Sequence, residues 1–516
     1  MSWWYGFLDV QLGGNNTVSN RSAEITRPMF QWIRILTSVL YYVGISQRQR
    51  EANQDMNNPY QYAKSNQERF LAEYQELLRI RTISTQPQHA KDVARAAEWL
   101  REMMLRIGMD RAEVILMPAG RCPLVLGEWN GAGEAAPTIL IYCHYDVQPA
   151  EVADGWDTEP FEPTIKDGRL YCRGAVDSKL HVMSNLKAVE SWLASDDKPK
   201  VNIKVVLEGE EESGSENINA FIAAHPERLA ADIAMISDGA ILAPGQPSLT
   251  YGLRGITGLE LHVSAPVSDL HSGHWGGSVH NPIQALCEIL AQLHDQNGAV
   301  TVPGFYDDVA AVTPQDRALL EKVEPFIQAE WDDVVSAPAV WGEAEYILPE
   351  RLGARPTLEI NGIHGGYTGA GMKTVLPARA FAKITCRLVP HQDPARVRQC
   401  VMAHINRIAP SSVSVEMRPS EPGAEAVLLD VAGSAMAAAA EAYTFAWGVK
   451  PVFERAGGSV PITFECMKVA KEVVIMSYGL KSGRAHGPNE NIYLQNFFNG
   501  IQATIKFIDV LGQGRG

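Results

Sequence analysis

The stretch Val205–Ser215, with the sequence VVLEGEEESGS, joins an apolar run to a dense acidic turn. The alternating residues that lead into it, Val201–Leu207, are typical of a β-strand that enters a core. Four carboxylates then follow within five residues, those of Glu208, Glu210, Glu211 and Glu212. Like charges this close repel one another unless water or cations neutralise them. An isolated run of this kind is more often a solvated loop than a cation site, so the choice depends on the rest of the chain.

Length and charge limit the classes of protein that the chain can represent. It has 516 residues and a formal net charge of −15. Roughly two or three domains are expected at this length, and the acidic balance argues against a nucleic-acid or membrane partner. The seven scattered cysteines lack CxxC spacing. They indicate buried side chains in a reducing, cytoplasmic setting rather than a disulfide framework or a thiolate zinc site.

Residues 1–55 form an N-terminal extension for which the sequence suggests no function. Within Met29–Ile45 the apolar run is interrupted by Gln31 and Arg34, which leaves only Ile35–Ile45 uncharged. That segment is shorter than the roughly 20 residues of a membrane span, and it lacks the basic start and cleavage site of a signal peptide. We expect an amphipathic packing helix, an oligomer contact or an extension without a fixed fold.

Residues from Pro59 to Leu105 have helical spacing, and strand-like and helical stretches then alternate to about Gly245 and again after Glu425. This alternation predicts an α/β architecture with a largely parallel sheet. The expected strands are Thr138–Cys143, Val201–Leu207, Ile233–Ile236 and Val473–Ser477, and the main expected helices are Leu180–Leu193, Ile218–Ala224, Leu428–Ala446 and Leu494–Val510. We therefore predict a discontinuous domain that covers residues 56–250 and 421–516.

Residues 251–420 have a different pattern, which predicts an inserted α+β domain. Strands are expected at Gly258–Ser264 and Ala378–Val389, and helices at Pro282–Asn297 and Asp393–Ile408. A long segment rich in Pro, Asp and Trp lies between the two pairs of elements.

Four expected strands of the discontinuous domain are followed by histidine or carboxylate side chains. Besides the acidic run, these are His144 and Asp146, then Asp238, then His486 in a glycine-rich loop. Each has a structural explanation when taken alone, but four such strand ends in one domain are hard to attribute to chance, because ligands gather at the carboxyl ends of parallel strands. Imidazole and carboxylate without thiolate suit catalytic Zn²⁺, Mn²⁺ or Co²⁺. Enough carboxylates are present for two ions that share a ligand.

The order of these motifs resembles the M20 metallopeptidases and, within them, the carnosinase-like dipeptidase branch. The motifs are His144-x-Asp146, Arg173-Gly-x-x-Asp177, Glu208-Gly-x-Glu211-Glu212-Ser-Gly-Ser, Ser237-Asp238 and Ala485-His486. The similarity extends from about residue 60 to the C-terminus. It implies a di-metal catalytic domain with an inserted dimerisation or lid domain, in agreement with the discontinuous layout.

The resemblance also implies a set of metal ligands. Asp177 would bridge two divalent ions, with Zn²⁺ expected first and Mn²⁺ or Co²⁺ as alternatives. His144 and Asp238 would complete one site, and Glu212 and His486 the other.

Two further acidic residues would act beside the metals. Asp146 would orient the imidazole of His144, as is usual for a ligating histidine. Glu211 would be the general base that takes a proton from the attacking water and passes it to the leaving amine. Members of the family with this motif have a cis peptide after the bridging aspartate, here Asp177–Ser178.

The insert would supply substrate contacts. The motif Asp269-Leu-His271-Ser-Gly273 resembles the family stretch whose histidine reaches the partner subunit's active site and polarises the scissile carbonyl. Thr374 and Arg387, together with Ser459, would bind the substrate's carboxylate. Carnosinase-like relatives commonly carry another substrate-contacting histidine downstream of this arginine, whereas residues 418–423 here (RPSEPG) have none. That departure leaves the exact substrate open.

These features predict a cytoplasmic, homodimeric metallohydrolase that cleaves small peptides with a free carboxylate, with dipeptidase action as the first choice. An N-acyl amino acid or carbamoyl amidohydrolase could use the same carboxylate clamp. A third alternative is an inactive binding protein, against which the complete set of ligands and base argues.

Overall fold

The computed structural model describes residues 58–116, 122–335 and 337–514. The predicted N-terminal extension, residues 1–55, therefore lies outside the described residues. None of the helices in the described ranges is long and apolar enough to cross a membrane.

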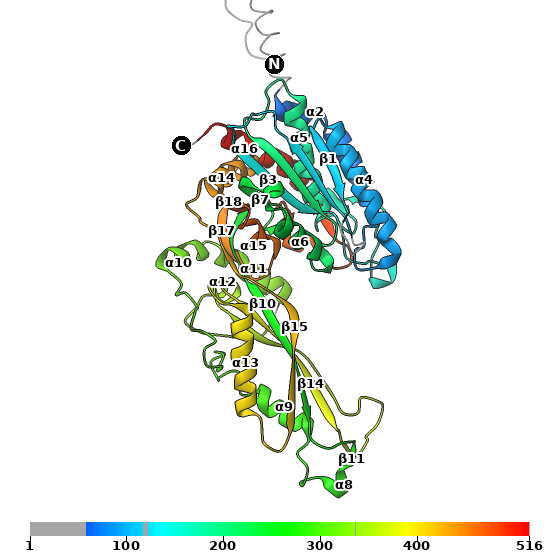
Figure 1. The fold of residues 1–516 in the computed structure, drawn as a ribbon, viewed down its shortest axis with the longest axis vertical. Coiled ribbons are helices and arrows are strands. Elements are labelled where there is room, and N and C mark those ends of the chain that lie inside the picture. The colour runs from blue at the N-terminus through cyan, green and yellow to red at the C-terminus, as the bar shows by residue number, and fades with distance from the viewer. Residues whose placement is uncertain (1–57, 117–121, 336, 515–516) are drawn as a thin grey trace, which may run out of the picture. The chain divides into compact units, whose positions relative to one another are not determined.

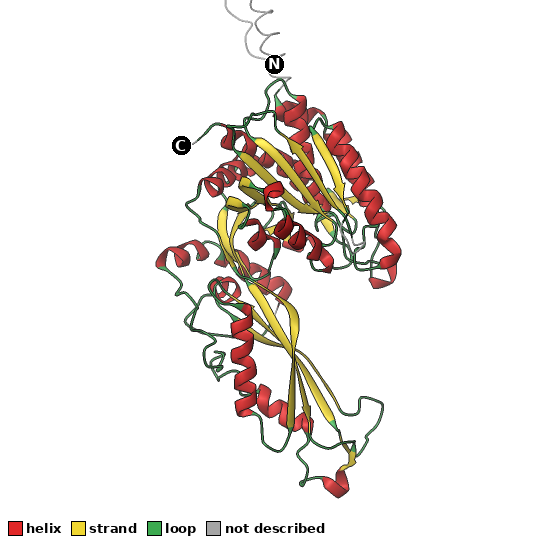
Figure 2. Ribbon diagram, viewed as in Figure 1, coloured by secondary structure: helices red, strands yellow, loops and turns green. Residues whose placement is uncertain are grey.

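A nine-stranded sheet is built from two separate parts of the chain, residues 111–253 and 427–475 (Figures 1 and 2). Its order is β1-β2-β6-β3-β7-β18-β9-β16, with β17 paired to β9. The strands are β1 (Arg111–Ile115), β2 (Leu124–Trp129), β3 (Thr138–His144), β6 (Asn202–Glu208), β7 (Ala231–Ile236), β9 (Ser248–Leu253), β16 (Val427–Leu428), β17 (Val452–Ala456) and β18 (Ala470–Ile475). The four neighbours β6, β3, β7 and β18 run parallel, so their carboxyl ends meet at one edge.

Helices cover this sheet because their apolar faces match its apolar strands. They are α2 (Pro59–Ser65), α3 (Gln67–Leu78), α4 (Ala90–Arg106), α5 (Lys179–Ala194), α6 (Glu216–Ala224), α7 (Pro226–Leu229), α14 (Ser434–Trp447), α15 (Ile462–Cys466) and α16 (Leu494–Gly512). Amphipathic α4 packs its Val93, Leu100 and Met104 side against β1 and β2. Helix α5 is buried along almost its full length, because it contacts β3 as well as α2, α3 and α16.

A second, antiparallel sheet has the order β12-β14-β10-β15 (Figure 2). Its strands are β10 (Gly255–Ser264), β12 (Thr357–Gly365), β14 (Arg379–Leu388) and β15 (Ser414–Ala424). The alternate residues of β14, from Ala380 to Leu388, face a core shared with α9 (Pro282–Leu290) and α13 (Pro394–Ile408). The opposite face of the sheet carries polar side chains such as Thr385 and Arg387. A single residue, Arg254, links β9 of the first sheet to β10 of the second.

The predicted α/β class with a mainly parallel central sheet is confirmed, but three details differ. The alanine-rich helix begins at Ser434 rather than at Leu428, because Val427–Leu428 pair with β9 as β16. The second sheet has four strands where two were predicted. Its additional strands are β12, which contains Gly362, and β15, which contains Pro419 and Pro422, and both were hidden by polar or turn-forming residues.

The third difference concerns the segment rich in Pro, Asp and Trp. It forms α10 (Pro314–Leu320), α11 (Glu324–Glu330) and α12 (Leu348–Gly353). Helices α10 and α12 contact β17 of the first sheet, and Val323, Ile327 and Leu348 form an apolar cluster with Leu242. Residues 251–420 therefore do not all belong to the second sheet, and the domain limits drawn from the sequence stay a prediction.

Candidate metal centre

Three side chains from separate segments form a first group of candidate metal ligands. His144 is the last residue of β3, Asp177 precedes α5, and Asp238 follows β7. Their ligand atoms lie within 4.8 Å of one another. The Nε2 atom of His144 is 3.0 Å from Asp177 Oδ1 and 3.9 Å from Asp238 Oδ1.

A second group shares Asp177 with the first. It adds Glu212 from the acidic turn and His486 from the loop after β18, again with all ligand atoms within 4.8 Å. His486 Nε2 is 3.1 Å from Asp177 Oδ2 and 3.1 Å from Glu212 Oε2. Since Asp177 turns one oxygen to each group, it has the geometry of a bridging carboxylate. The peptide bond Asp177–Ser178 is cis, which confirms that prediction.

The charges and donor atoms of the two groups fit divalent cations. Within the described ranges, no Lys or Arg forms an ion pair with Asp177, Glu212 or Asp238, whose ion-pair partners are the two histidines. One buried oxygen, Glu212 Oε1, has no hydrogen-bond partner. Imidazole nitrogens with carboxylate oxygens are the donors of catalytic zinc, manganese or cobalt sites. The five residues could therefore hold two such ions.

Asp146 connects the end of β3 to the acidic turn. It is fully buried, and its Oδ1 lies 3.3 Å from His144 Nδ1. The same carboxylate accepts hydrogen bonds from the backbone N–H of Glu211 (3.2 Å) and of Glu212 (3.1 Å). Asp146 thus orients both the imidazole and the turn, which is a common arrangement behind a ligating histidine.

The carboxylates around the two histidines favour the protonated imidazoles. Burial alone would lower the pKa of His144, but hydrogen bonds with Asp146 and Asp177 outweigh it and raise that pKa well above the usual value. Hydrogen bonds with Asp177 and Glu212 raise the pKa of His486 to about 10. Burial would raise the pKa of Asp177, yet its bonds with His144 and His486 hold it below the usual range. The carboxylates that favour these protons would also attract metal cations.

The glutamates of the acidic run have four different surroundings. Burial, reinforced by Asp238 and Glu212, raises the pKa of Glu211 to about 8 although His144 opposes the shift. Glu212 belongs to the second ligand group, as described above. These two side chains are partly buried next to the candidate metal positions, so the solvated-loop interpretation is wrong for them.

The other two glutamates of the run support the fold. Glu208 is fully buried and accepts a hydrogen bond from the Tyr142 hydroxyl at 2.6 Å, and burial raises its pKa to about 8. Glu210, to which the sequence assigned no chemistry, accepts bonds from the backbone N–H (2.5 Å) and side-chain amide (2.6 Å) of Asn217. It thereby holds the first turn of α6.

Sequence reasoning missed Glu490, which lies four residues after His486. Its buried carboxylate accepts the backbone N–H groups of Gly174, Val176 and Asp177 at 2.8–3.0 Å. It also accepts Arg173 Nη1 at 2.7 Å, while Arg173 Nη2 donates to the carbonyl of His486 at 3.1 Å. The Arg173–Glu490 pair therefore ties the two ligand-bearing loops together. The position of Glu490 directly after the His486 motif was the one available signal.

The structure separates the predicted carboxylate-binding residues into two places. Arg387 Nη1 donates to Ser459 Oγ at 3.2 Å, and Ser459 Oγ donates to the carbonyl of Arg254 at 2.5 Å. Thr374 instead lies next to β13 (Val375–Leu376), where its carbonyl accepts the N–H of Ser272 at 3.1 Å.

His271 lies beside Thr374, because β11 (Leu270–His271) pairs with β13 beyond one end of β14 (Figure 1). Arg387 lies near the other end of β14, where it pairs with Ile256 of β10. The eight steps from Arg379 to Arg387 span roughly 25 Å at the usual rise of a strand. Within one chain Thr374 therefore lies far from Arg387 and Ser459. That these three residues bind the substrate's carboxylate stays a prediction.

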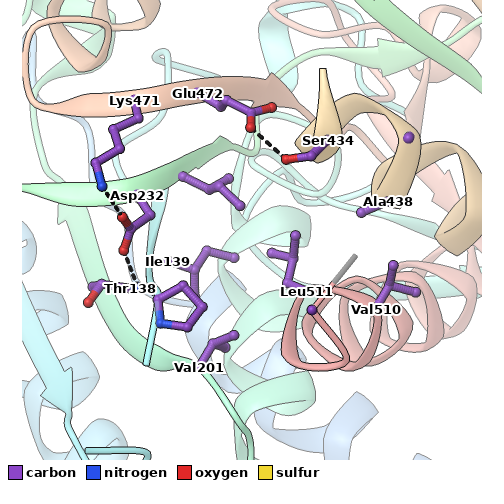
Figure 3. Close-up of a pocket in the computed structure, with 14 residues that line it drawn as sticks. Thr138, Ile139, Val201, Asp232, Ser434, Ala438, Lys471, Glu472, Val510 and Leu511 are labelled. Carbon is purple, nitrogen blue, oxygen red and sulfur yellow. Dashed lines mark hydrogen bonds and ion pairs between the residues drawn. The ribbon is translucent and has the colours of Figure 1, made fainter. Parts of the chain in front are cut away.

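A cavity of about 380 Å³ lies at the opposite, amino edge of the nine-stranded sheet (Figure 3). Its lining includes residues at the starts of β3, β7 and β18, such as Thr138, Asp232 and Lys471. Its charged groups are already paired, with Asp232 Oδ1 2.7 Å from Lys471 Nζ and Glu472 Oε1 accepting the Ser434 hydroxyl at 2.5 Å. No predicted site residue lines this cavity.

The model of peptidase family M20/M25/M40 matches residues 140–509. The chain belongs to this family. The Cys-Gly metallodipeptidase dug1 of Schizosaccharomyces pombe is 33% identical over 75% of this chain and 83% of its own length. The human Beta-Ala-His dipeptidase is 30% identical over 88% of this chain and 92% of its own length. The solved structure of the di-peptidase Dug1p from Saccharomyces cerevisiae is 27% identical, with a TM-score of 0.75 over 89% of this chain and 98% of that one. The predictions of an M20 metallopeptidase and of similarity to carnosinase-like dipeptidases are confirmed.

Proposed function

We propose that the protein is a dipeptidase that hydrolyses the amide bond of a small peptide with the help of two divalent metal ions. The observation that carries this proposal is the sharing of Asp177 between two groups of ligand atoms, with the Glu211 carboxyl next to them. The relatives with similar sequences carry the names of Cys-Gly and Beta-Ala-His dipeptidases, which supports a dipeptide as the substrate class.

The proposed ligands are His144, Asp177 and Asp238 for one ion and Asp177, Glu212 and His486 for the other. Zinc is the first choice, with manganese or cobalt as alternatives, because this donor set serves all three. When bound, the ions would polarise the scissile carbonyl and lower the pKa of a coordinated water.

In this proposal Glu211 moves the proton. A carboxyl whose pKa lies near neutral can accept a proton from the attacking water and return it to the leaving amine. Burial raises the pKa of Glu211 to about 8, and nearby cations would bring it down again toward neutral. Asp146 would accept a hydrogen bond from the Nδ1–H of His144 and so keep the Nε2 lone pair available to a metal.

Arg387 and Ser459 are the proposed binding groups for the free carboxylate of the substrate. A guanidinium can capture a carboxylate through two parallel hydrogen bonds. Such a clamp at a fixed distance from the metals would exclude long peptides and so favours dipeptides over longer chains.

We further infer a homodimer in which His271 and Thr374 act in the partner's site. Support comes from their separation of roughly 25 Å from Arg387 in one chain. Large apolar side chains near them are exposed, with Val267 and Met372 almost fully accessible and Trp275 51% exposed. Exposed apolar groups of this kind are common where subunits associate. A cytoplasmic location is part of the proposal, because six of the seven cysteines are free thiols, namely Cys143, Cys172, Cys287, Cys386, Cys400 and Cys466.

Metal analysis combined with a substrate panel tests the reaction. The purified protein is expected to bind two ions per chain and to release amino acids from dipeptides such as Ala-Ala, but not from tripeptides. Turnover of N-acetyl or N-carbamoyl amino acids alone would identify an amidohydrolase instead. A protein without metal and without turnover on either group would be an inactive binding protein.

Mixing two inactive variants tests the dimer. In a mixed dimer of His271→Ala and Glu211→Gln, one of the two sites has both its own Glu211 and the partner subunit's His271. Recovery of up to about one quarter of wild-type activity is expected for random association. If His271 acted within its own chain, mixing would restore nothing.

A further inference from the structure

A second cavity, of about 450 Å³, lies next to Arg387 in the part of the chain between β9 and β15. Its floor is the open face of the second sheet, with Glu359 and Asn361 from β12 and Thr385 and Arg387 from β14. Residues from 331 to 356, which include two tryptophans, form another wall. Arg254, the single residue that links the two sheets, also lines it.

Arg254 and Arg387 are two cations of this cavity that have no carboxylate partner among the described residues. Arg254 Nε donates to the carbonyl of Gly457 at 3.0 Å, and Arg387 Nη1 donates to the hydroxyl of Ser459 at 3.2 Å. By contrast, Arg355 in the same lining forms two bonds of 2.7 Å with Glu343. Arg351 of the lining also lacks a carboxylate partner among the described residues, but its guanidinium donates to the backbone carbonyls of Tyr346 (2.8 Å) and Trp341 (3.2 Å). Arg254 and Arg387 thus point to an anion that is not part of the fold.

The whole lining supports this interpretation. It contains four arginines and two glutamates, in a chain whose formal net charge is −15. Glu359 is exposed and lies beyond ion-pair distance of both cations, although its field still acts on Arg254. Burial and the neighbouring Arg387 lower the pKa of Arg254 to about 10, so it keeps its charge at neutral pH. A partly buried charge without a partner is costly, which makes a ligand anion the natural counter-charge.

The two cations also border the same small volume. Both arginines line the cavity, and the charge of Arg387 acts on the Arg254 guanidinium. Ser459 Oγ accepts the bond from Arg387 and donates to the backbone carbonyl of Arg254. The carboxylate and the side chain of a C-terminal amino acid are bonded to the same carbon atom, Cα. A residue whose carboxylate is held by Arg387 can therefore extend its side chain toward Arg254.

We propose that this cavity binds the side chain of the substrate's C-terminal residue and that Arg254 selects an acidic side chain there. Arg387 takes the terminal carboxylate, and Arg254 takes the second negative charge. The substrate class is therefore dipeptides that end in glutamate or aspartate. This inference rests on the proposed dipeptidase function and adds a specificity-determining residue to it.

A pair of nearly isosteric substrates tests the inference directly. Ala-Glu and Ala-Gln differ in one charge, and kcat/KM is measured for both with the metal-loaded wild-type protein. A charge-assisted bond is expected to favour Ala-Glu by about tenfold or more. Arg254→Gln should bring the ratio close to one, because it removes the charge that the acidic side chain would use.

Two further variants separate this role from a general electrostatic or structural one. Lys383 lies on the same strand and open face as Arg387 but outside the cavity, 3.6 Å from Glu260. Lys383→Gln removes the same charge and should leave the ratio unchanged. Arg254→Lys keeps the charge without the planar fork and should retain part of the preference, which decides the matter if Arg254→Gln does not fold.

The outcomes distinguish this inference from the proposed function. If Ala-Gln is hydrolysed but Ala-Glu is not preferred, the selection by Arg254 is refuted and the dipeptidase remains. If Arg254→Gln weakens both substrates equally, or if Lys383→Gln removes the preference as well, Arg254 is not the selecting residue. If no dipeptide of the panel is cleaved, the proposed function itself fails.

Discussion

The two edges of the nine-stranded sheet carry the same types of acidic side chain in opposite electrostatic situations. At the amino edge (Figure 3), Asp232 pairs with Lys471, and Glu472 accepts the Ser434 hydroxyl and the N–H of Ala435. At the carboxyl edge, the ligand groups described above have histidines as their partners and no Lys or Arg among the described residues.

This difference shows how a fold can form a cation site. The amino edge neutralises its charges with its own side chains and backbone dipoles, so an added ion would gain little there. In the part of the chain that the structure describes, the carboxylates of the ligand groups at the carboxyl edge have only the imidazoles of His144 and His486 as ion-pair partners. Divalent ions are stronger counter-charges than protons on these imidazoles.

The largest effect is expected for Asp177→Asn, which removes the carboxylate shared by both ligand groups. Both ions should bind far more weakly, and kcat/KM should fall on the order of 10⁴-fold. The matched control at the amino edge, Asp232→Asn, should keep full metal content and cost less than about 1 kcal/mol, because its ion pair with Lys471 is largely exposed. Metal content by mass spectrometry and unfolding in urea measure both. Equal losses in the two variants would remove the distinction between the edges.

The second-largest effect is expected for a variant of the proposed base, Glu211, in which the proposed metal ligands are unchanged. Glu211→Gln keeps the shape of the side chain but cannot hold the transferred proton, so kcat should fall about 10²- to 10³-fold. Metal content should stay at the wild-type level, because Glu211 belongs to neither ligand group. Near-full activity of this variant would assign the base to another residue.

The parts of this arrangement that lie close together in the sequence were the ones that the sequence could predict. Apolar runs marked β3, β6, β7 and β18, and the segments after them contain His144, Glu212, Asp238 and His486. Asp177, and the roles of all five proposed ligands, followed from the family resemblance. The cis bond at Asp177–Ser178 followed from family resemblance in the same way. Local patterns were sufficient there because each strand places its next residues at the carboxyl edge.

Long-range partners were not predictable from local patterns. The hydrogen bond between Arg173 and Glu490 joins residues 317 positions apart, and neither has a periodic signal. Thr374 and Arg387 lie only 13 residues apart in the chain, yet β14 separates them because an extended strand carries its ends away from each other. Strand β15 was missed because its prolines are typical of turns, although an edge strand tolerates them.

The third effect is a dependence of metal affinity on pH. The pKa of His144 is raised and that of His486 is raised to about 10, so protons are expected to compete with metal ions for these imidazoles. A metal ion needs the lone pair of each imidazole, so binding must release these protons, and affinity should rise as the pH rises. Each released proton contributes about tenfold per pH unit. Competition with a chelating dye at pH 6, 7 and 8 measures the slope. A slope of zero would show that the imidazoles are already neutral before the metal binds.

The smallest effect compares two glutamates that accept backbone N–H groups at opposite edges. Glu490→Gln leaves Arg173 buried without its partner and turns an amide donor toward backbone donors, so unfolding should become easier by about 3–5 kcal/mol. Because Asp177 and His486 depend on this pair, metal affinity should also fall about 10- to 100-fold.

The control is Glu472→Gln, because the Glu472 carboxylate supports only the start of α14. This variant should cost about 1 kcal/mol and leave metal affinity unchanged. Isothermal titration with zinc and urea unfolding of both variants measure these quantities. If Glu490→Gln loses stability but keeps its metal affinity, Glu490 only stabilises the fold. If both are lost, Glu490 positions the metal ligands.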